Sequence, residues 1–343
     1  MNYILRDTNA VFWECGYACD NCIFLALNGA RFFITDARYS LEASELAKNA
    51  QIVQSSDLTL SARKILRSYK VRAVIFDPND FSFGAFNTLS KNLKTRFIPK
   101  PNFSQIRRTI KSENELEILR TAAKIGASKF DEFAKFVSEN GLGMSEKELF
   151  YNATLIFKDS GNLALSFEPI VAINQNAAKA HALPSDERLK DGDLLLLDAG
   201  VRYKNYCSDR TRTAKFSAQN GINFSKNQNF GDLRKDKIYA IVKEAQKRAI
   251  NAVKPGVAAR EIDKIARDYI AQNGFGAQFL HSTGHGVGVD IHELPIISPR
   301  SKAILEEGMI FSIEPGIYLQ GEFGVRIEDT VIVTKNGCEV MSE

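Results

Sequence analysis

Histidine is rare in this chain of 343 residues, and its distribution is uneven. Three of the four histidines, His281, His285 and His292, lie within one short segment, and the fourth is His181. Residues 281–286 are also rich in glycine, which lets a backbone approach a ligand closely. A scarce residue type that gathers in this way indicates chemistry, so we treat all four imidazoles as candidate site residues.

Two aspartates belong to one expected pair of strands. Asp198 ends the continuous apolar run 194–197, which is typical of a buried strand, and an unpaired charge is costly to bury there. Asp209 lies on the next expected strand, residues 207–216. If residues 201–206 hold the turn of a hairpin, both carboxylates can face the same point. The alternative is that Arg210 or Arg212 pairs with these aspartates as a structural salt bridge.

Two glutamates follow closer to the C-terminus. Glu314 ends another apolar run, and Glu328 lies two residues after Arg326. On a strand, residues two apart point to one face, so Arg326 and Glu328 are expected to share a surface. Arg326 could also be no more than a structural partner of Glu328.

These carboxylates and one imidazole favour a metal site. Such a donor set suits hard or borderline divalent ions such as Mn²⁺. Four carboxylates are more than one ion usually needs, and they can bridge two ions about 3.5–4 Å apart. The candidate metal ligands are therefore the carboxylates of Asp198, Asp209, Glu314 and Glu328, together with at least one of the imidazoles.

The first hundred residues have the pattern of a small α/β domain. Apolar runs at 22–27 and 31–35 predict strands, and Asn28-Gly29 between them is a strong hairpin signal. Helices are expected at 41–47 and 60–69, and a short strand at 71–76.

A domain boundary is expected near Pro99-Lys100-Pro101, because the residue before each proline is pushed towards extended geometry. We therefore predict one domain over residues 1–105 and a second over residues 106–343.

The second domain opens on two helix starts. Ser112 with Glu115, and Ser145 with Glu148, have the spacing of a capping box. Residues 217–236 are polar and have no periodicity, which predicts a surface loop or flexible insertion. Strands are expected at 169–173, 193–198 and 207–216, and helices at 237–253 and 258–272.

Composition excludes several classes of function. The net charge of +4 is small and no basic block is concentrated in the chain, which argues against a nucleic-acid partner. No apolar stretch approaches the roughly 20 residues of a membrane helix, and the polar N-terminus is not a signal peptide. An odd number of cysteines, five, favours reduced thiols and a cytoplasmic location.

Five ordered motifs resemble those of the pita-bread metallopeptidases. Within that family the chain is similar to Xaa-Pro aminopeptidases (aminopeptidase P) and Xaa-Pro dipeptidases (prolidases). The resemblance covers nearly the whole chain, since residues 9–11 and 35–39 resemble the creatinase-type N-terminal domain of these enzymes. The motifs are Leu196-Leu197-Asp198-Ala199-Gly200, Ser208-Asp209-Arg210-Thr211, His281-Ser282-Thr283-Gly284-His285-Gly286-Val287-Gly288, Ile313-Glu314-Pro315-Gly316 and Gly324-Val325-Arg326-Ile327-Glu328-Asp329.

The resemblance implies an α+β fold, with a pita-bread catalytic domain after a smaller creatinase-like α/β domain. It also implies two divalent metal ions, Mn²⁺ first, with Co²⁺ or Zn²⁺ as alternatives. Asp198 would be a ligand, Asp209 and Glu328 would bridge the ions, and His285 and Glu314 would hold one of them. Glu314 would also carry the proton of the attacking water.

The other site residues receive substrate roles from the same resemblance. His292 would stabilise the tetrahedral intermediate, and His181 would contact the substrate near the scissile bond. His281 and Arg326 would help to build the pocket for the proline side. The one departure from the family pattern is the long polar stretch 217–236, which leaves the metal ligands untouched.

The expected activity is hydrolysis of the bond between an N-terminal residue and proline in proline-containing peptides. The first hypothesis is an Xaa-Pro aminopeptidase and the alternative an Xaa-Pro dipeptidase, because the residues that decide between them lie in loops. A metal-free creatinase-like hydrolase or binding protein is opposed by the intact ligands. A methionine aminopeptidase is opposed by the extra N-terminal domain and by Arg326. Relatives of this kind assemble as homodimers or larger homo-oligomers.

The cysteines offer one competing interpretation. Cys15, Cys19 and Cys22 have the C-x3-C-x2-C spacing of some iron–sulfur sites, which would indicate a radical enzyme. No βα series of the barrel type follows, so buried free thiols are the favoured explanation. Cys207 and Cys338 are interpreted as structural.

Overall fold

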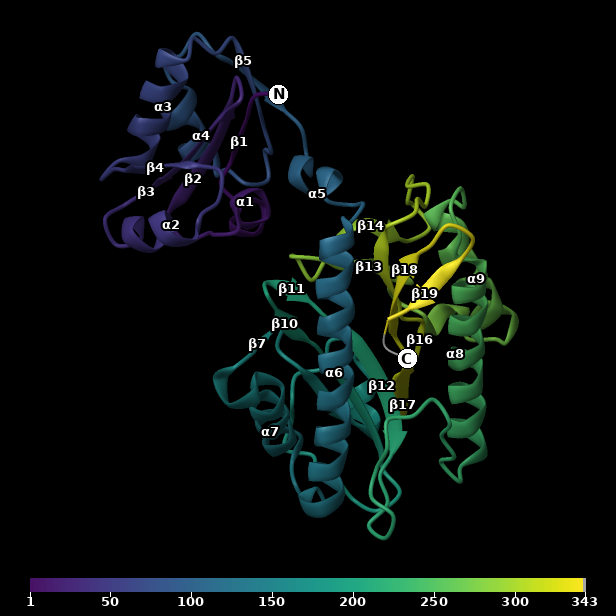
Figure 1. The fold of residues 1–343 in the computed structure, drawn as a ribbon. Coiled ribbons are helices and arrows are strands. Elements are labelled where there is room, and N and C mark those ends of the chain that lie inside the picture. Colours follow the sequence, from purple (N-terminus) through teal and green to yellow (C-terminus); the bar gives the residue numbers. More distant parts are fainter. Residues whose placement is uncertain (342–343) are drawn as a thin grey trace. The chain divides into compact units, whose positions relative to one another are not determined.

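The computed structural model describes residues 1–341, which divide into a first unit, Met1–Arg108, and a second unit that begins at Thr109 (Figure 1). Helices and strands are mixed in both units, so the predicted α+β class is confirmed. No helix among the described residues is long and apolar enough to cross a membrane.

The first unit is built on one six-stranded sheet in the order β4-β3-β2-β1-β5-β6. Its centre is buried on both faces, because alternate side chains of β2 belong to two separate hydrophobic clusters. The strands are β1 (Tyr3–Leu5), β2 (Cys22–Leu27), β3 (Ala30–Thr35), β4 (Gln51–Gln54), β5 (Ala73–Phe76) and β6 (Arg96–Pro99). The helices are α1 (Thr8–Cys15), α2 (Ser40–Leu46), α3 (Leu58–Ser68), α4 (Phe83–Ser90) and α5 (Phe103–Arg107).

The predicted hairpin is present between β2 and β3. Asn28 and Gly29 have φ values of 51° and 90°, the left-handed geometry that a two-residue hairpin turn requires. Leu27 pairs with Ala30 on either side of the turn. The helices expected at 41–47 and 60–69 are α2 and α3, each shifted by one or two residues.

Helix α1 was not predicted, and it changes the setting of the three cysteines. Cys15 ends α1, Cys19 lies in the following loop and Cys22 begins β2. All three are buried free thiols.

The second unit places its strands between two pairs of helices. Helices α6 (Glu113–Asn140) and α7 (Glu146–Lys158) pack on one side, and α8 (Leu233–Ala252) and α9 (Ala259–Gln272) on the other (Figure 1). Both predicted capping boxes, at Ser112 and Ser145, are formed.

The described strands of this unit form several small sheets. A three-stranded sheet has the order β12-β9-β8, and a five-stranded sheet has the order β14-β13-β15-β18-β19. Two smaller ones have the orders β11-β10-β7 and β16-β17. The strands are β7 (Ala164–Leu165), β8 (Ile170–Ile173), β9 (Leu194–Ala199), β10 (Val201–Tyr203), β11 (Tyr206–Cys207), β12 (Arg210–Lys215), β13 (Gly284–Gly286), β14 (Glu293–Ile297), β15 (Ile310–Ile313), β16 (Gly316–Leu319), β17 (Phe323–Arg326), β18 (Asp329–Val333) and β19 (Cys338–Val340).

Strand β9 is sandwiched between the two helix pairs. Leu195 and Leu197 belong to the cluster around α6 and α7, while Leu194 and Leu196 belong to the cluster around α8 and α9. The whole strand is buried, as the apolar run that ends in Asp198 predicted.

The polar stretch 217–236 is a loop as far as Asp232, after which α8 begins. It is not a loosely attached insertion. Ile222 and Phe224 are buried in the cluster around α6 and α7, and Phe230 is buried in the cluster around α8 and α9. These apolar contacts with two separate cores fix the loop against the body of the unit.

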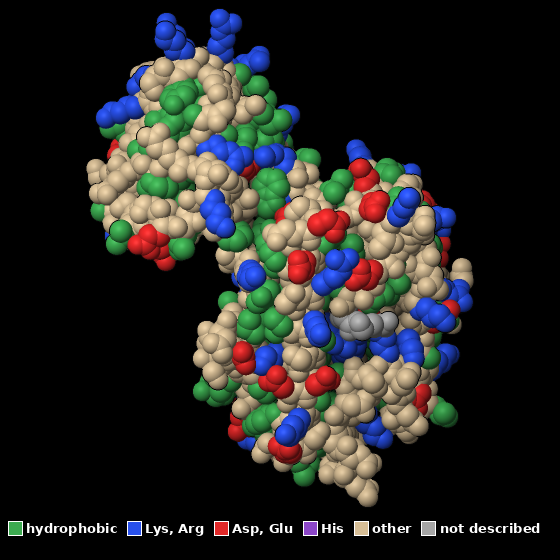
Figure 2. All heavy atoms as spheres, viewed as in Figure 1, with side chains coloured by type: hydrophobic (Ala, Val, Ile, Leu, Met, Phe, Trp, Pro, Cys, Tyr) green, Lys and Arg blue, Asp and Glu red, His purple; other side chains and the backbone are tan. Residues whose placement is uncertain are grey.

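The surface of the second unit carries charges of both signs. Figure 2 shows acidic and basic side chains on the visible face of this unit, with neither sign alone.

Candidate metal centre

The two predicted aspartate ligands lie at the end of one antiparallel pair of strands. Asp198 of β9 is opposite Thr211 of β12, and Asp209 immediately precedes β12. The turn expected in 201–206 is the tight β10–β11 hairpin. At Gly200 a Cβ atom would lie 1.9 Å from the Ser208 carbonyl oxygen, so only glycine allows the two chains to approach so closely.

The two glutamates are brought together by the pairing of β15 with β18. Ile313 is opposite Asp329 at the end of this pair, so Glu314 leaves the sheet where Glu328 enters it. One expectation was wrong: Arg326 ends β17 and Glu328 lies between β17 and β18, so the two do not share a strand.

His285 is the central residue of β13, which pairs with β14 and β15. A Cβ atom at Gly284 would lie 1.8 Å from the Ser312 carbonyl oxygen, and one at Gly286 would lie 2.3 Å from that of Leu294. The glycines around His285 therefore serve the close approach of neighbouring strands, and not of a ligand as the sequence suggested.

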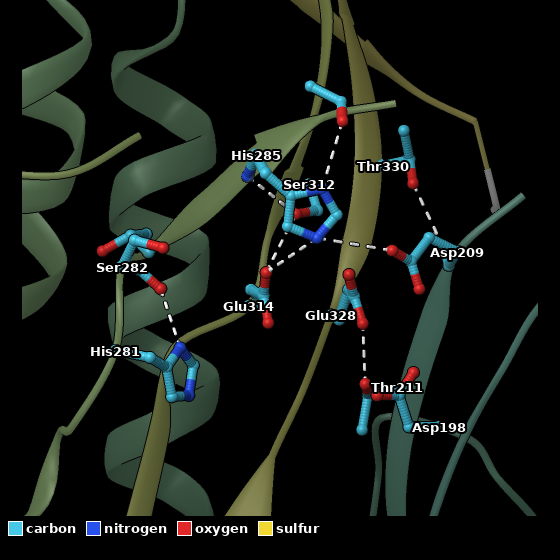
Figure 3. Close-up of polar contacts among 12 residues, drawn as sticks. Asp198, Asp209, Thr211, His281, Ser282, His285, Ser312, Glu314, Glu328 and Thr330 are labelled. Carbon is cyan, nitrogen blue, oxygen red and sulfur yellow. Dashed lines mark hydrogen bonds and ion pairs between the residues drawn. The ribbon is translucent and has the colours of Figure 1, made fainter. Parts of the chain in front are cut away.

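The imidazole of His285 lies among the carboxylates (Figure 3). Its Nε2 is 3.5 Å from Asp209 Oδ2 and 3.3 Å from Glu314 Oε1. Its Nδ1 is 3.1 Å from the Gly286 carbonyl oxygen, which accepts a hydrogen bond from Nδ1–H and leaves the Nε2 lone pair directed at the carboxylates. Asp209, His285 and Glu328 each offer a donor atom within 4.8 Å of the others.

Two of the carboxylates are half satisfied by the protein. Asp198 Oδ2 accepts a hydrogen bond from Arg326 Nη2 at 2.6 Å, and Glu328 Oε2 accepts one from Thr211 Oγ1 at 2.6 Å. The other oxygens, Asp198 Oδ1 and Glu328 Oε1, are buried with no hydrogen-bond partner among residues 1–341. Buried oxygens in this condition require an unseen donor or a cation.

The electrostatics of the site require positive charge. Burial raises the pKa of Asp209 well above its usual range, and the neighbouring Glu328 and Asp198 raise it further. Burial likewise raises the pKa of Glu328 and of Glu314. Four carboxylates cannot all be ionised so close together in a buried site unless cations neutralise them. The donor set therefore fits two divalent ions, for which carboxylate oxygens and one imidazole are suitable ligands.

Tyr318 was missed by the sequence analysis. Its hydroxyl group lies 2.8 Å from His281 Nε2 and accepts a hydrogen bond from Arg326 Nη1 at 2.9 Å. Burial raises the pKa of Tyr318 to about 12. Because His281 Nδ1 lies 2.8 Å from the Ser282 carbonyl oxygen, which can only accept, Nε2 is the unprotonated ring nitrogen and accepts from the Tyr318 hydroxyl group. The available signal was a tyrosine within the apolar strand that directly follows the Glu314 motif.

Arg326 is only 3% exposed, and its guanidinium group is fully engaged. Besides Asp198 and Tyr318 it contacts Thr211 Oγ1 at 3.0 Å and the Ala180 carbonyl oxygen at 3.0 Å. It meets Glu328 through the shared Thr211 hydroxyl.

Arg212, one of the two arginines considered as a structural partner of these aspartates, pairs with Asp329 instead.

Two histidines lie towards the solvent side of the site. His292 and His181 are exposed, and the ring centre of His292 is 4.2 Å from that of His285. Burial of its ring lowers the pKa of His292, and the neighbouring His285 lowers it further.

The predicted site residues all border one cavity of about 640 Å³, a size typical of small-molecule sites. The structure thus brings together residues that span most of the second unit, although their roles stay predictions. They are His181, Asp198, Asp209, His281, His285, His292, Glu314, Arg326 and Glu328.

Comparisons with known proteins agree with this site. Residues 117–335 match metallopeptidase family M24. The chain is 37% identical over 274 residues to an Xaa-Pro dipeptidase of Pyrococcus furiosus, covering 77% of this chain and 74% of that protein.

Solved structures of Xaa-Pro peptidases are also similar to this chain. An Xaa-Pro dipeptidase from Bacillus anthracis is 33% identical with a TM-score of 0.90, covering 100% of this chain and 92% of that one. An X-Pro aminopeptidase from Thermotoga maritima is 29% identical with a TM-score of 0.87, covering 100% of this chain and 95% of that one.

Proposed function

Since the chain belongs to metallopeptidase family M24, we propose that it is an Xaa-Pro dipeptidase, which hydrolyses the bond between a first residue and a C-terminal proline. The observation that carries the proposal is the cavity in which His285 and four buried or half-buried carboxylates converge beside three further histidines. The recognised family and its pita-bread catalytic fold make the protein a peptidase; the substrate is the proposed part.

The cavity residues would hold two divalent ions, for which we propose Mn²⁺. Asp198, Asp209, His285, Glu314 and Glu328 would be the ligands, as the half-satisfied carboxylates support. When bound, such ions supply a nucleophile near neutral pH by lowering the pKa of a coordinated water.

We propose that Glu314 moves the proton of that water. Its Oε1 accepts a hydrogen bond from Ser312 Oγ at 3.1 Å, which fixes the carboxylate beside His285. A carboxylate held beside the attacking water can accept its proton and later return it.

We propose that the exposed histidines contact the substrate. His292, next to His285 at the cavity mouth, would donate to the oxygen that becomes negative as the carbonyl carbon turns tetrahedral. His181 would contact the substrate near the scissile bond. His281, held by Tyr318, would contact the proline side together with Arg326.

The comparisons favour a dipeptidase over the aminopeptidase that was our first expectation. The Pyrococcus furiosus and Bacillus anthracis proteins are both named Xaa-Pro dipeptidases, and their sequence identities to the chain, 37% and 33%, are higher than the 29% of the Thermotoga maritima aminopeptidase.

Apolar side chains dominate the rest of the cavity lining, which suits an apolar first residue and the proline ring. A dipeptide such as Leu-Pro is therefore the appropriate test substrate. The apolar lining residues include Phe150, Phe167, Pro169, Ile170, Leu183, Ile291 and Ile296.

The test compares Leu-Pro with Leu-Pro-Ala as substrates of the Mn²⁺-loaded protein. We expect kcat/KM for the dipeptide to exceed that for the tripeptide by at least about tenfold, a difference of about 1.4 kcal/mol in transition-state binding. Equal rates, or a faster tripeptide, would establish the aminopeptidase instead. Hydrolysis of neither peptide would reject both.

Three further proposals accompany this function. We propose that residues 1–105 form the creatinase-like domain and residues 106–343 the catalytic domain. We also propose a homodimer or larger homo-oligomer, and a cytoplasmic location, which the odd number of cysteines supports.

A further inference from the structure

A second polar cluster lies directly behind the proposed metal ligands, and its centre is Asp329. This carboxylate has no exposed surface, and three side chains donate to it. Arg212 Nη2 lies 2.5 Å from Asp329 Oδ1, while Lys226 Nζ and Gln246 Nε2 lie 2.6 Å and 2.9 Å from Oδ2.

The cluster holds the backbone at or next to both proposed glutamate ligands. Arg212 Nη1 donates to the Glu328 carbonyl oxygen, one residue before Asp329. Gln246 Nε2 also donates to the Ile313 carbonyl oxygen at 3.2 Å, one residue before Glu314. A shift of the Asp329 carboxylate would therefore move the backbone of Glu328 and of Ile313, the residue before Glu314.

Lys226 is the member of this cluster that comes from the loop before α8. Its side chain is 21% exposed at one end and reaches the fully buried Asp329 at the other. The loop around it is preorganised, because Gln228 Nε2 donates to the Asn223 and Ser225 carbonyl oxygens at 2.8 Å and 2.9 Å. Phe224, two residues before Lys226, is buried against Phe130 and Phe133.

Charge balance alone does not explain the lysine. Arg212 already supplies one positive charge for the single carboxylate of Asp329. Lys226 adds a second cation, and together with Gln246 it holds the oxygen that Arg212 Nη2 does not contact. Held from both oxygens, the Asp329 carboxylate cannot rotate without breaking a charge-assisted hydrogen bond.

We propose that Lys226 is a positioning residue for the metal centre, through which the loop before α8 fixes Asp329 and so keeps Glu328 in a geometry that binds metal. The inference rests on the proposed metal-dependent function of the cavity. It assigns to this loop a role in metal affinity, although no residue of the loop borders the cavity.

The test compares Lys226→Met with a matched control, Lys243→Met. Lys243 Nζ donates to Asn227 Oδ1 at 2.8 Å, so it ties the same loop to α8 through a hydrogen bond that does not involve the Asp329 cluster. The protein is stripped of metal and titrated with Mn²⁺ alone by calorimetry. Partners that orient metal ligands typically contribute 10–100-fold to affinity, so we expect the dissociation constant to rise about tenfold in Lys226→Met.

The control and a conservative variant separate positioning from general damage. Lys243→Met should keep the Mn²⁺ dissociation constant within about twofold, and Lys226→Arg should restore most of the lost affinity. The inference is overturned if Lys226→Met leaves the dissociation constant unchanged, or if both methionine variants raise it equally. If Lys226→Met does not fold, Lys226→Gln, which keeps a donor without the charge, is subject to the same criteria.

The failure of this inference can be distinguished from the failure of the proposed function. Mn²⁺ binding by the unaltered chain without cleavage of Leu-Pro would reject the dipeptidase, while the comparison of dissociation constants would still decide the role of Lys226. Absence of Mn²⁺ binding by the unaltered chain would overturn the metal centre and this inference with it.

Discussion

Two neighbouring acids, Glu328 and Asp329, differ in how far the protein satisfies their carboxylate oxygens. Both are buried, at 2% and 0% exposure. Glu328 receives one hydrogen bond, from Thr211, and its second oxygen has no partner among the described residues. Asp329 is held from both oxygens by two cations and an amide.

This difference separates a structural carboxylate from one that is reserved for a ligand. A buried charge that the protein itself neutralises is part of the scaffold. A buried charge that the protein leaves half satisfied, beside others of the same sign, destabilises the native state until a cation binds. The contrast between Glu328 and Asp329 therefore marks where the metal-binding face of the site ends.

The largest effect should follow from removing the charge of one of the proposed metal-binding carboxylates. Asp209→Asn keeps the shape of the side chain but loses its charge, so at least one metal ion should no longer bind. Activity on Leu-Pro should fall by more than the roughly 100-fold that loss of an outer partner costs. Metal content and kcat/KM are measured together, with the exposed Asp186→Asn as a control. Unchanged metal content in Asp209→Asn would contradict the assignment.

Loss of a partner of Asp329 should instead lower the free energy of unfolding. Arg212→Met removes the principal cation beside Asp329, and breaking a buried ion pair costs about 3–5 kcal/mol of unfolding free energy. The exposed pair of Lys147 and Asp186 provides the comparison, because Lys147→Met should cost at most about 1 kcal/mol. Urea unfolding of both variants measures the difference. Equal losses would mean that Asp329 is no better anchored than a surface acid.

The proposed ligands and Asp329 should also make the free energy of unfolding depend on pH in opposite directions. Asp209 and Glu328 have raised pKa values in the metal-free fold, chiefly through burial, so the folded state holds protons that the unfolded chain releases. The unfolding free energy of the metal-free protein should therefore fall as pH rises above about 4.5.

Asp329 contributes in the other direction. Although burial opposes it, Arg212 and Lys226 lower the pKa of Asp329 to about 2, so its stabilising pair persists above the usual value and is lost only towards pH 2. Asp329 stays ionised between about pH 5 and about pH 8, so urea unfolding at these two values, with and without Mn²⁺, tests the fall expected from Asp209 and Glu328. Asp209→Asn should flatten the fall in the metal-free protein, and a flat profile in the unaltered chain would contradict the prediction.

The smallest effect is expected at Tyr318, which contacts the proposed substrate-binding residues His281 and Arg326. Tyr318→Phe removes the hydroxyl that joins His281 to Arg326, so both side chains lose one fixed contact. We expect kcat/KM for Leu-Pro to fall about tenfold, equivalent to about 1.4 kcal/mol, while Mn²⁺ affinity changes little. The exposed Tyr151→Phe serves as the control. A loss of metal affinity in Tyr318→Phe would move this tyrosine to the metal side of the site.

The sequence predicted the metal side of the site better than its supports. Each proposed ligand lies at the end of an apolar run or in a segment of distinctive composition, so local pattern was sufficient to select Asp198 and Glu314 as candidates. The supporting contacts join residues that are far apart in the chain, such as Lys226 to Asp329 and Arg326 to Asp198. No local pattern encodes such pairs, because they depend on the completed packing of the unit.

The same physical reason explains which elements were found. The capping boxes at Ser112 and Ser145 and the turn at Asn28-Gly29 are local signals, and all three are present. Strands β4 and β6 are short edge strands with half-exposed side chains, so they lack both a continuous apolar run and a clear alternation. They form because β3 and β5 offer free edges.

The most direct test of the central claim is a crystal structure of the protein grown with Mn²⁺, examined by anomalous scattering. The account predicts two peaks about 3.5–4 Å apart in the cavity, with Asp209 and Glu328 between them. The previously unpartnered oxygens Asp198 Oδ1 and Glu328 Oε1 should both be within bonding distance of an ion. A cavity without anomalous signal at saturating Mn²⁺, or ions held by other residues, would contradict it.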